Sequence, residues 1–203
     1  EQIKTNSDVT AASYATILGD LNRTGDKVSW VIGTECFDWG YKFNSGDNWV
    51  GYWYPQGVSG TASAFSTGKV NGHYVTLVSW YHKPEEDSST SENKGARISF
   101  IRTTDSDSIK YRNILLVEPY EEMYSTGPVA SFKPVVFHAG GMAWYKNFLY
   151  VADTSHGFRV FDMSKMMKVS TGSNSTIGCL PWNNNCQAYN YKYVLPMVAR
   201  YRL

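Results

Sequence analysis

His138 is the side chain whose type and setting offer the most chemistry in this sequence. It stands in the segment Phe137-His-Ala-Gly-Gly-Met142, where glycines let the backbone come close to a ligand or to a neighbouring strand. A neutral imidazole can act as a general base, a proton donor or a metal ligand. The alternative is a histidine that only hydrogen-bonds a neighbouring strand. Glu35 or Asp153 would be its acidic partner in catalysis.

The candidate carboxylates also have ordinary structural explanations. Asp153 begins the segment Asp-Thr-Ser-His-Gly, so it either faces the site or closes a turn. Glu35 and Asp38 form a carboxylate pair of the kind that glycosidases use at a suitable separation, but a turn capped by aspartate explains them equally well. The sequence has no Gly-x-Ser-x-Gly elbow, P-loop or His-Glu-x-x-His motif, so enzyme activity stays open.

A second set of side chains suits binding without chemistry. Gln56 stands in the Gly-rich segment 55–60, which matches the surroundings of His138, and its amide can bind a sugar hydroxyl. Trp and Tyr rings suit sites that are partly apolar and partly polar, with core packing as their default alternative. The candidate ligand-binding residues are Gln56, Trp53, Tyr81, Trp144 and Tyr145.

The histidines give little support to a metal site. There are four, His73, His82, His138 and His156, so a three-histidine site would need most of them. His73, His82 and His156 lie at turn-like positions, which predicts exposed side chains. No metal ligand is assigned, and calcium stays a candidate cofactor because scattered oxygen ligands leave no motif.

The three cysteines divide into a pair and a single residue. Cys179 and Cys186 close a short loop in which Pro181 and three asparagines favour a turn, so we expect a disulfide between them. Reduced thiols in a cytosolic protein are the alternative. Cys36 is then either a buried thiol, a disulfide partner of another polypeptide, or a nucleophile beside Glu35.

Two glycosylation sequons favour secretion to the extracellular space. They place acceptor asparagines at Asn22 and Asn174. The first 20 residues carry no apolar signal segment, which fits a mature N-terminus left by signal cleavage.

The composition excludes several classes of protein. The chain has 203 residues, 18% of them charged and 15% aromatic, with a net charge of +1. Such a chain can bury a core, so global disorder is excluded, and a nucleic-acid partner has no support. No run of about 18 apolar residues occurs, so we expect no membrane partner.

Most apolar segments that must position these side chains are typical of strands. A short helix is expected over residues 8–21, capped by Ser7 or Asp8, in an N-terminal arm of residues 1–27. From residue 28 to residue 203, β-branched and aromatic runs alternate with Gly, Asn, Asp, Ser and Pro clusters. The pattern predicts an antiparallel all-β protein, with residues 84–94 as an exposed hairpin excursion.

An internal repeat refines this prediction. Gly57-Val-Ser-Gly-Thr-Ala62 is similar to His138-Ala-Gly-Gly-Met-Ala143, and Gly95-Ala-Arg-Ile-Ser-Phe100 is similar to Gly157-Phe-Arg-Val-Phe161. Each copy continues into apolar strands, which gives two units over residues 49–118 and 135–203. Four antiparallel strands per unit are typical of a β-propeller blade.

A resemblance to a protein family points the same way. The phrase Asn147-Phe-Leu-Tyr-Val-Ala-Asp153, followed by Gly157-Phe-Arg-Val-Phe-Asp162, resembles a strand pair of secreted bacterial and fungal β-propeller proteins of uncharacterised activity. Trp53-Tyr-Pro-Gln-Gly-Val58 resembles the opening of a blade in the same group. The resemblance covers residues 49–203 and implies a fold, not an activity.

Two blades cannot close a propeller ring, which usually has four to eight. We therefore expect an incomplete propeller that a second polypeptide completes, with Cys36 as a candidate link. The alternative is a small sandwich or barrel of about 8–10 strands that is complete by itself.

These predictions support two main functions. The first is binding of a glycan or another small polar ligand at the channel mouth of the propeller. The second is a secreted hydrolase or lyase with His138 as general acid or base and a carboxylate partner. A purely structural or partner-binding propeller is a third possibility.

Overall fold

The computed structural model describes residues 8–28, 36–40, 46–104, 109–180, 182 and 185–202. Strands dominate this part of the chain, which confirms the all-β prediction. The two α-helices are short: α1 (Tyr14–Leu18) and α2 (Thr61–Ala64). No helix in the described ranges has the length and apolar character needed to cross a membrane.

The helix α1 is shorter than the sequence pattern predicts. Residues Thr10–Ala11 form strand β1, which pairs with β12 (Met167–Lys168), so the helix begins only after them. Ser13 caps it: its side chain accepts from the Thr16 backbone N–H at 3.2 Å, and the Thr16 side chain accepts from the Ser13 N–H at 3.2 Å. This reciprocal capping box satisfies two backbone donors at the start of the helix.

Each repeat unit contributes four strands. In the first unit the four strands follow one another in the chain, and in the second unit further strands are inserted before the last one. The first unit contains β4 (Trp53–Gly60), β5 (Val75–His82), β6 (Ala96–Arg102) and β7 (Ile109–Tyr124), each antiparallel to the next. The second contains β9 (Met142–Tyr145), β10 (Phe148–Asp153), β11 (Gly157–Asp162) and β15 (Tyr193–Tyr201), again antiparallel. Each predicted unit thus contributes neighbouring strands, but these belong to one mixed sheet, and four-stranded blades are not clearly formed.

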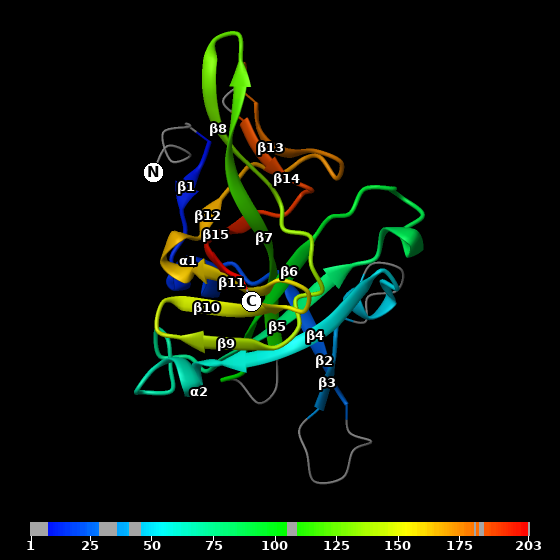
Figure 1. Cartoon of the computed structure of the whole chain (residues 1–203). Helices are drawn as coiled ribbons and strands as arrows, with labels where there is room; N and C mark the ends of the chain where they lie inside the picture. Colours follow the sequence, from blue (N-terminus) through cyan, green and yellow to red (C-terminus); the bar gives the residue numbers. More distant parts are fainter. Residues whose placement is uncertain are drawn as a thin grey trace.

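The two units join into one mixed, barrel-like sheet, and separate propeller blades are not apparent (Figure 1). Their last strands, β7 and β15, pair in parallel with Leu115 opposite Val194. In two separate blades, β7 and β15 would each be an edge strand, whereas here they are hydrogen-bonded to each other. The sheet order β4-β5-β6-β7-β15-β11-β10-β9 matches the barrel alternative more closely.

The sheet nearly closes where the first strands of the two units meet. The Trp144 backbone N–H donates to Ser59 Oγ at 2.9 Å, and Ser79 Oγ donates to the carbonyl of Ala139 at 2.7 Å. A Cβ atom on Gly57 would lie 2.1 Å from the carbonyl oxygen of Gly140. The matching Gly-rich segments thus contact each other across the seam, so their glycines have a packing role.

Further elements extend and cover this sheet. Strand β2 (Arg23–Val28) pairs with β7 and with β3 (Cys36–Asp38), so the N-terminal arm joins the sheet. Strand β8 (Gly127–Pro134) forms a long hairpin with β7 that stands out at the top of Figure 1. A small hairpin, β13 (Ile177–Leu180) with β14 (Asn185–Ala188), lies beside it. The short 3-10 helices are η2 (Asp47–Trp49), η3 (Pro84–Glu86) and η4 (Met163–Lys165).

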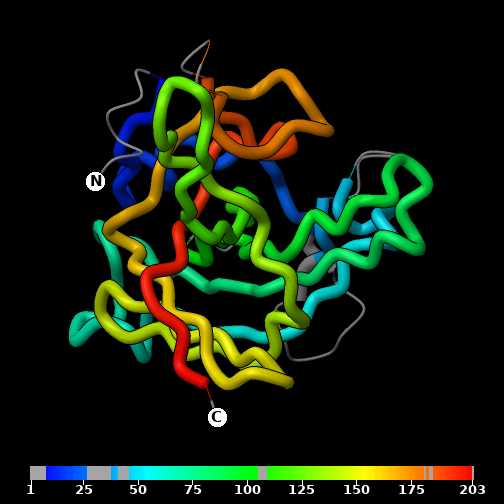
Figure 2. The backbone as a smooth tube through the Cα atoms, turned by 45° about the horizontal axis from the view of Figure 1, so that its top comes forward, coloured from blue at the N-terminus to red at the C-terminus, as the bar shows by residue number. Residues whose placement is uncertain are grey.

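Apolar side chains form two clusters around the sheet. The larger one gathers inward-pointing residues of both units, among them Leu77, Ile98, Phe100, Ile114, Trp144, Leu149 and Leu195. The second gathers Trp53, Trp80, Leu115, Val117 and Val194 beneath the β13–β14 hairpin. The strands thus have apolar residues on both faces, which is why their sequences are nearly continuous hydrophobic runs. The chain tube in Figure 2 shows the two units wrapped around a common interior.

The disulfide between Cys179 and Cys186 is confirmed, with an S–S distance of 2.01 Å. It joins β13 to β14, and the Cys179 N–H attaches this hairpin to β8 by donating to Ser131 Oγ at 2.9 Å. The position of Cys36 in β3 is described, with its backbone opposite Val28. Glu35 lies outside the described residues, so the Glu35–Asp38 pair stays a prediction.

Candidate functional site

His138 and Tyr81 lie together on the surface. Their ring centroids are 4.6 Å apart, and the centroids of the Tyr54 and Tyr81 rings are 5.5 Å apart. Gln56 is exposed, and its amide donates to the carbonyl of Pro55 at 2.8 Å. His138 and Gln56 are thus exposed and Tyr81 is half-buried, and their role in binding stays a prediction.

Trp144 instead lies in the hydrophobic core. Only 1% of it is exposed, and its ring contacts Tyr14, Phe65 and Phe100. Its indole N–H donates to the Lys146 carbonyl at 2.8 Å, which satisfies the buried donor. The neighbouring Tyr145 is exposed, with the Lys146 ammonium 5.3 Å above its ring. Trp144 is therefore a core residue, and of these two neighbouring aromatic residues Tyr145 is the one whose ring is exposed to solvent.

Asp153 is held in an ion-pair cluster of the β10–β11 hairpin. Its carboxylate pairs with Arg159 Nη2 at 2.8 Å and with His156 Nδ1 at 3.3 Å. Burial by itself would raise the pKa of Asp153, but the bonds from Arg159 and His156 outweigh it and hold the pKa below its ordinary value. The described partners of Asp153 are thus local, which fits the turn alternative.

A polar pocket of about 510 Å³, which we call the Arg97 pocket, lies elsewhere. Aromatic residues Tyr52, Trp53, Tyr189 and Tyr191 line it, together with the amides of Asn22, Asn113, Asn174 and Asn190. The cationic residues of its lining are Arg23, Lys94, Arg97, Arg112 and Lys192. Of the ligand-binding residues that the sequence predicts, Trp53 lines this pocket.

A buried ion pair forms one wall of the Arg97 pocket. Asp47 Oδ1 accepts from Arg97 Nη2 at 2.9 Å, and Oδ2 accepts from the Tyr111 hydroxyl at 2.7 Å and pairs with Arg23 Nη1 at 3.0 Å. The Asn113 amide also donates to Asp47, at 3.2 Å. Burial opposes ionisation of Asp47, but Arg97 and Arg23 prevail and lower its pKa.

Arg97 itself is fixed from several sides. It is 3% exposed, and its guanidinium lies 4.3 Å from the Trp53 ring and 5.0 Å from the Trp80 ring. Its Nη1 donates to the Tyr191 hydroxyl at 3.2 Å. Stacking and ion pairing together hold this cation in one geometry.

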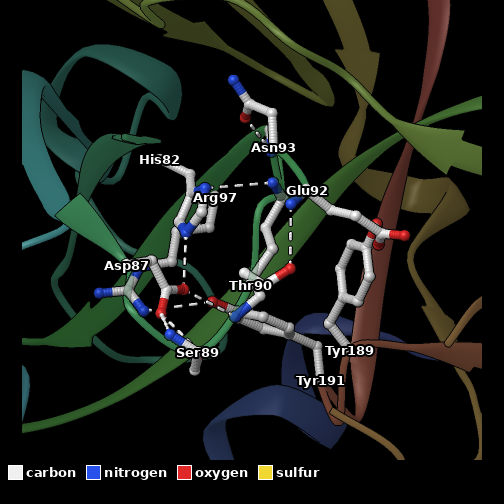
Figure 3. A network of polar contacts seen from close by, with 11 residues as sticks. His82, Asp87, Ser89, Thr90, Glu92, Asn93, Arg97, Tyr189 and Tyr191 are labelled. Carbon is white, nitrogen blue, oxygen red and sulfur yellow. Dashed lines mark hydrogen bonds and ion pairs between the residues drawn. The ribbon is translucent and has the colours of Figure 1, made fainter. Parts of the chain in front are cut away.

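A buried histidine stabilises the loop beside the pocket (Figure 3). His82 Nε2 bonds Asp87 Oδ2 at 3.0 Å, and His82 Nδ1 accepts from the Lys94 backbone N–H at 3.2 Å. The Lys94 ammonium pairs with the same Asp87 oxygen at 2.9 Å, and the Ser89 N–H donates to Asp87 Oδ1 at 3.0 Å. Because both ring nitrogens are used, we assign a neutral imidazole that carries its proton on Nε2.

The prediction that His82 is exposed was wrong: it is 2% exposed. Strand β5 continues through His82, and the following loop folds back so that Asp87 covers the ring. Burial lowers the pKa of His82 and outweighs the hydrogen bond to Asp87, which raises it. Burial by itself would raise the pKa of Asp87, but hydrogen bonds from Ser89, His82 and Lys94 hold it well below its ordinary value.

The sequence patterns did not predict Asp47, Arg97 or residues 189–192 as site residues. The signal for Arg97 was a charged residue inside an apolar strand, because buried arginine needs a partner. Both sequon asparagines, Asn22 and Asn174, line the same pocket although they are far apart in the sequence. Within the described ranges, no group of three or more His, Cys, Asp or Glu side chains could hold a metal ion. Calcium binding therefore stays a prediction.

No protein-family model, curated protein or solved structure matches this chain.

Proposed function

We propose that this chain is a secreted protein that binds a glycan or another small polar ligand, without chemistry, in the Arg97 pocket. The observation that carries this proposal is the lining, which combines the aromatic side chains Tyr52 and Tyr191 with amide and cationic donors. Its volume of about 510 Å³ lies within the range usual for small-molecule sites. Aromatic faces can cover the apolar side of a sugar ring, while amides bind its hydroxyl groups.

A matched pair of tyrosine variants tests the location of binding. Glycan-array screening would identify a saccharide, and isothermal titration calorimetry would then compare Tyr52→Ala with Tyr145→Ala. Tyr52 lines the pocket, whereas Tyr145 is an exposed tyrosine of β9. We expect Tyr52→Ala to weaken binding at least about 10-fold and Tyr145→Ala to leave it unchanged. The reverse result would place binding on the surface that carries Tyr145.

The alternative is a hydrolase or lyase in which His138 is the general acid or base. The observation in its favour is that His138 is exposed beside Tyr81, so a substrate could reach its ring. Turnover that His138→Ala abolishes, with a pH profile near the imidazole pKa, would support catalysis. Turnover retained in His138→Ala would reject the role of this residue.

Secretion and glycosylation belong to the same proposal. The disulfide is compatible with an oxidising compartment. Expression through a secretory pathway should attach glycans at Asn22 and Asn174, which Asn22→Gln and Asn174→Gln would remove one at a time. Since both residues line the Arg97 pocket, enzymatic removal of the glycans should increase access to it. Equal ligand affinity before and after removal would contradict this effect.

We also propose that the chain is part of a propeller that a second polypeptide completes. It would require strands beyond the two four-stranded units, and Cys36 would be the candidate link. Mass spectrometry of the native, unreduced protein would show a larger disulfide-linked species. A single species of 22.9 kDa plus glycan would reject the link through Cys36 and favour the self-contained barrel.

A further inference from the structure

The lining of the Arg97 pocket carries more positive than negative charge. Of its described residues five are cationic (Arg23, Lys94, Arg97, Arg112 and Lys192), whereas Asp47 is the single carboxylate. Three more described carboxylates bond to lining residues: Asp20, Asp87 and Glu92. Five cations against these four carboxylates leave an excess of one positive charge. None of the three additional carboxylates lines the pocket.

The one carboxylate in the lining is already saturated. Asp47 accepts from Arg97 and Asn113 on Oδ1 and from Tyr111, Arg23 and Asn113 on Oδ2. A carboxylate has about four acceptor positions, so Asp47 has no remaining capacity for the hydroxyl groups of a ligand. Among the charged groups of the lining, those that remain to bind a ligand are therefore the cations.

Two of the cations keep part of their side chains accessible. The side chains of Arg23 and Lys192 are 35% and 34% exposed, compared with 2% for Asp47. Lys192 Nζ pairs with Asp20 at 2.6 Å, and an ammonium has three donor hydrogens, so its bonding capacity exceeds this one contact. Cationic donors bind carboxylate or sulfate oxygens more strongly than neutral hydroxyl groups.

We infer that the ligand is an acidic saccharide, whose carboxylate or sulfate group binds the cationic side chains that line the Arg97 pocket. The rings of Tyr52 and Tyr191 contact the sugar, and Arg23 and Lys192 bind the anionic group. This inference rests on the proposed function, because it specifies the class of glycan for the same pocket.

Binding of paired saccharides tests the inference. Calorimetry would compare trigalacturonic acid with its fully methyl-esterified form, which has the same sugars but no charge, and a sulfated with an unsulfated galactose oligosaccharide. We expect at least one acidic saccharide to bind about 10-fold more tightly than its neutral counterpart, with affinity that falls between about 50 mM and 300 mM salt. The two acidic arms distinguish carboxylate from sulfate.

A lysine variant and a matched control locate the anion. Lys192→Gln should weaken binding of the acidic saccharide about 5- to 10-fold and weaken binding of its neutral counterpart less, while Arg112 and Tyr193 still hold Asp20. Lys133→Gln, an exposed lysine of β8, is the control and should have no effect. Equal binding of acidic and neutral saccharides would overturn the inference but keep the proposed function. Binding of neither member of either pair would count against both.

Discussion

The ion pair between Asp47 and Arg97 makes the sharpest prediction about stability. Asp47→Asn keeps the shape of the side chain but removes the charge that compensates Arg97, which is 3% exposed. Breaking a buried pair by removing one partner costs about 3–5 kcal/mol. Arg23 contributes little to this value because its side chain is 35% exposed. In a chain of 203 residues, the loss should lower Tm by about 6–20 °C.

Denaturant unfolding followed by near-ultraviolet circular dichroism would measure this loss. The control is the double variant Asp47→Asn with Arg97→Met, in which both charges are absent and a flexible apolar chain lies between Trp53 and Trp80. We expect the double variant to recover at least half of the loss, because an uncompensated buried charge is the main cost. A loss below about 1 kcal/mol for Asp47→Asn, or simple additivity of the two single variants, would refute this reasoning.

Three further predictions concern the core, the buried histidine and the disulfide. Trp144→Ala should destabilise the fold by about 3–5 kcal/mol, as large core truncations do, whereas exposed Tyr145→Ala should stay within about 0.5 kcal/mol; urea unfolding would measure both, and similar losses would contradict the core position of Trp144. Because burial lowers the pKa of His82 below its ordinary 6.5, its contribution to stability is present above pH 6.5 and is lost as pH falls through the folded pKa. Urea midpoints from pH 7.5 to 5 should therefore fall less in His82→Gln than in the parent, and an unchanged pH slope would count against the neutral buried imidazole. Replacing Cys179 and Cys186 by serine should cost about 2–3 kcal/mol, since they enclose a loop with a sequence separation of only 7; a thermal melt unaffected by the change would contradict that value.

Local patterns in the sequence were sufficient to predict several of the strands. β-branched and aromatic runs between turn residues predicted β5, β6, β7, β10, β11 and β15 because strand preference depends on short segments. The disulfide was predictable for the same reason, since its two cysteines lie in one short loop. Strand β8 was missed, because its segment between Gly127 and Pro134 alternates less clearly.

The sequence pattern could not predict how the two units associate. Their parallel contact joins Leu115 to Val194, and strand periodicity does not specify which distant strands pair. Composition could not separate Trp144 in the core from Tyr145 at the surface, because aromatic residues suit both places.

The sequence by itself determined the all-β class and the disulfide, because each depends on residues close together in the chain. Tertiary structure decided the sheet order, the burial of His82 and the composition of the Arg97 pocket. That pocket collects Arg23, Arg97 and Lys192 from distant segments. Only the folded chain brings these charges together, so the proposed preference for an acidic ligand could not be read from the net charge of +1.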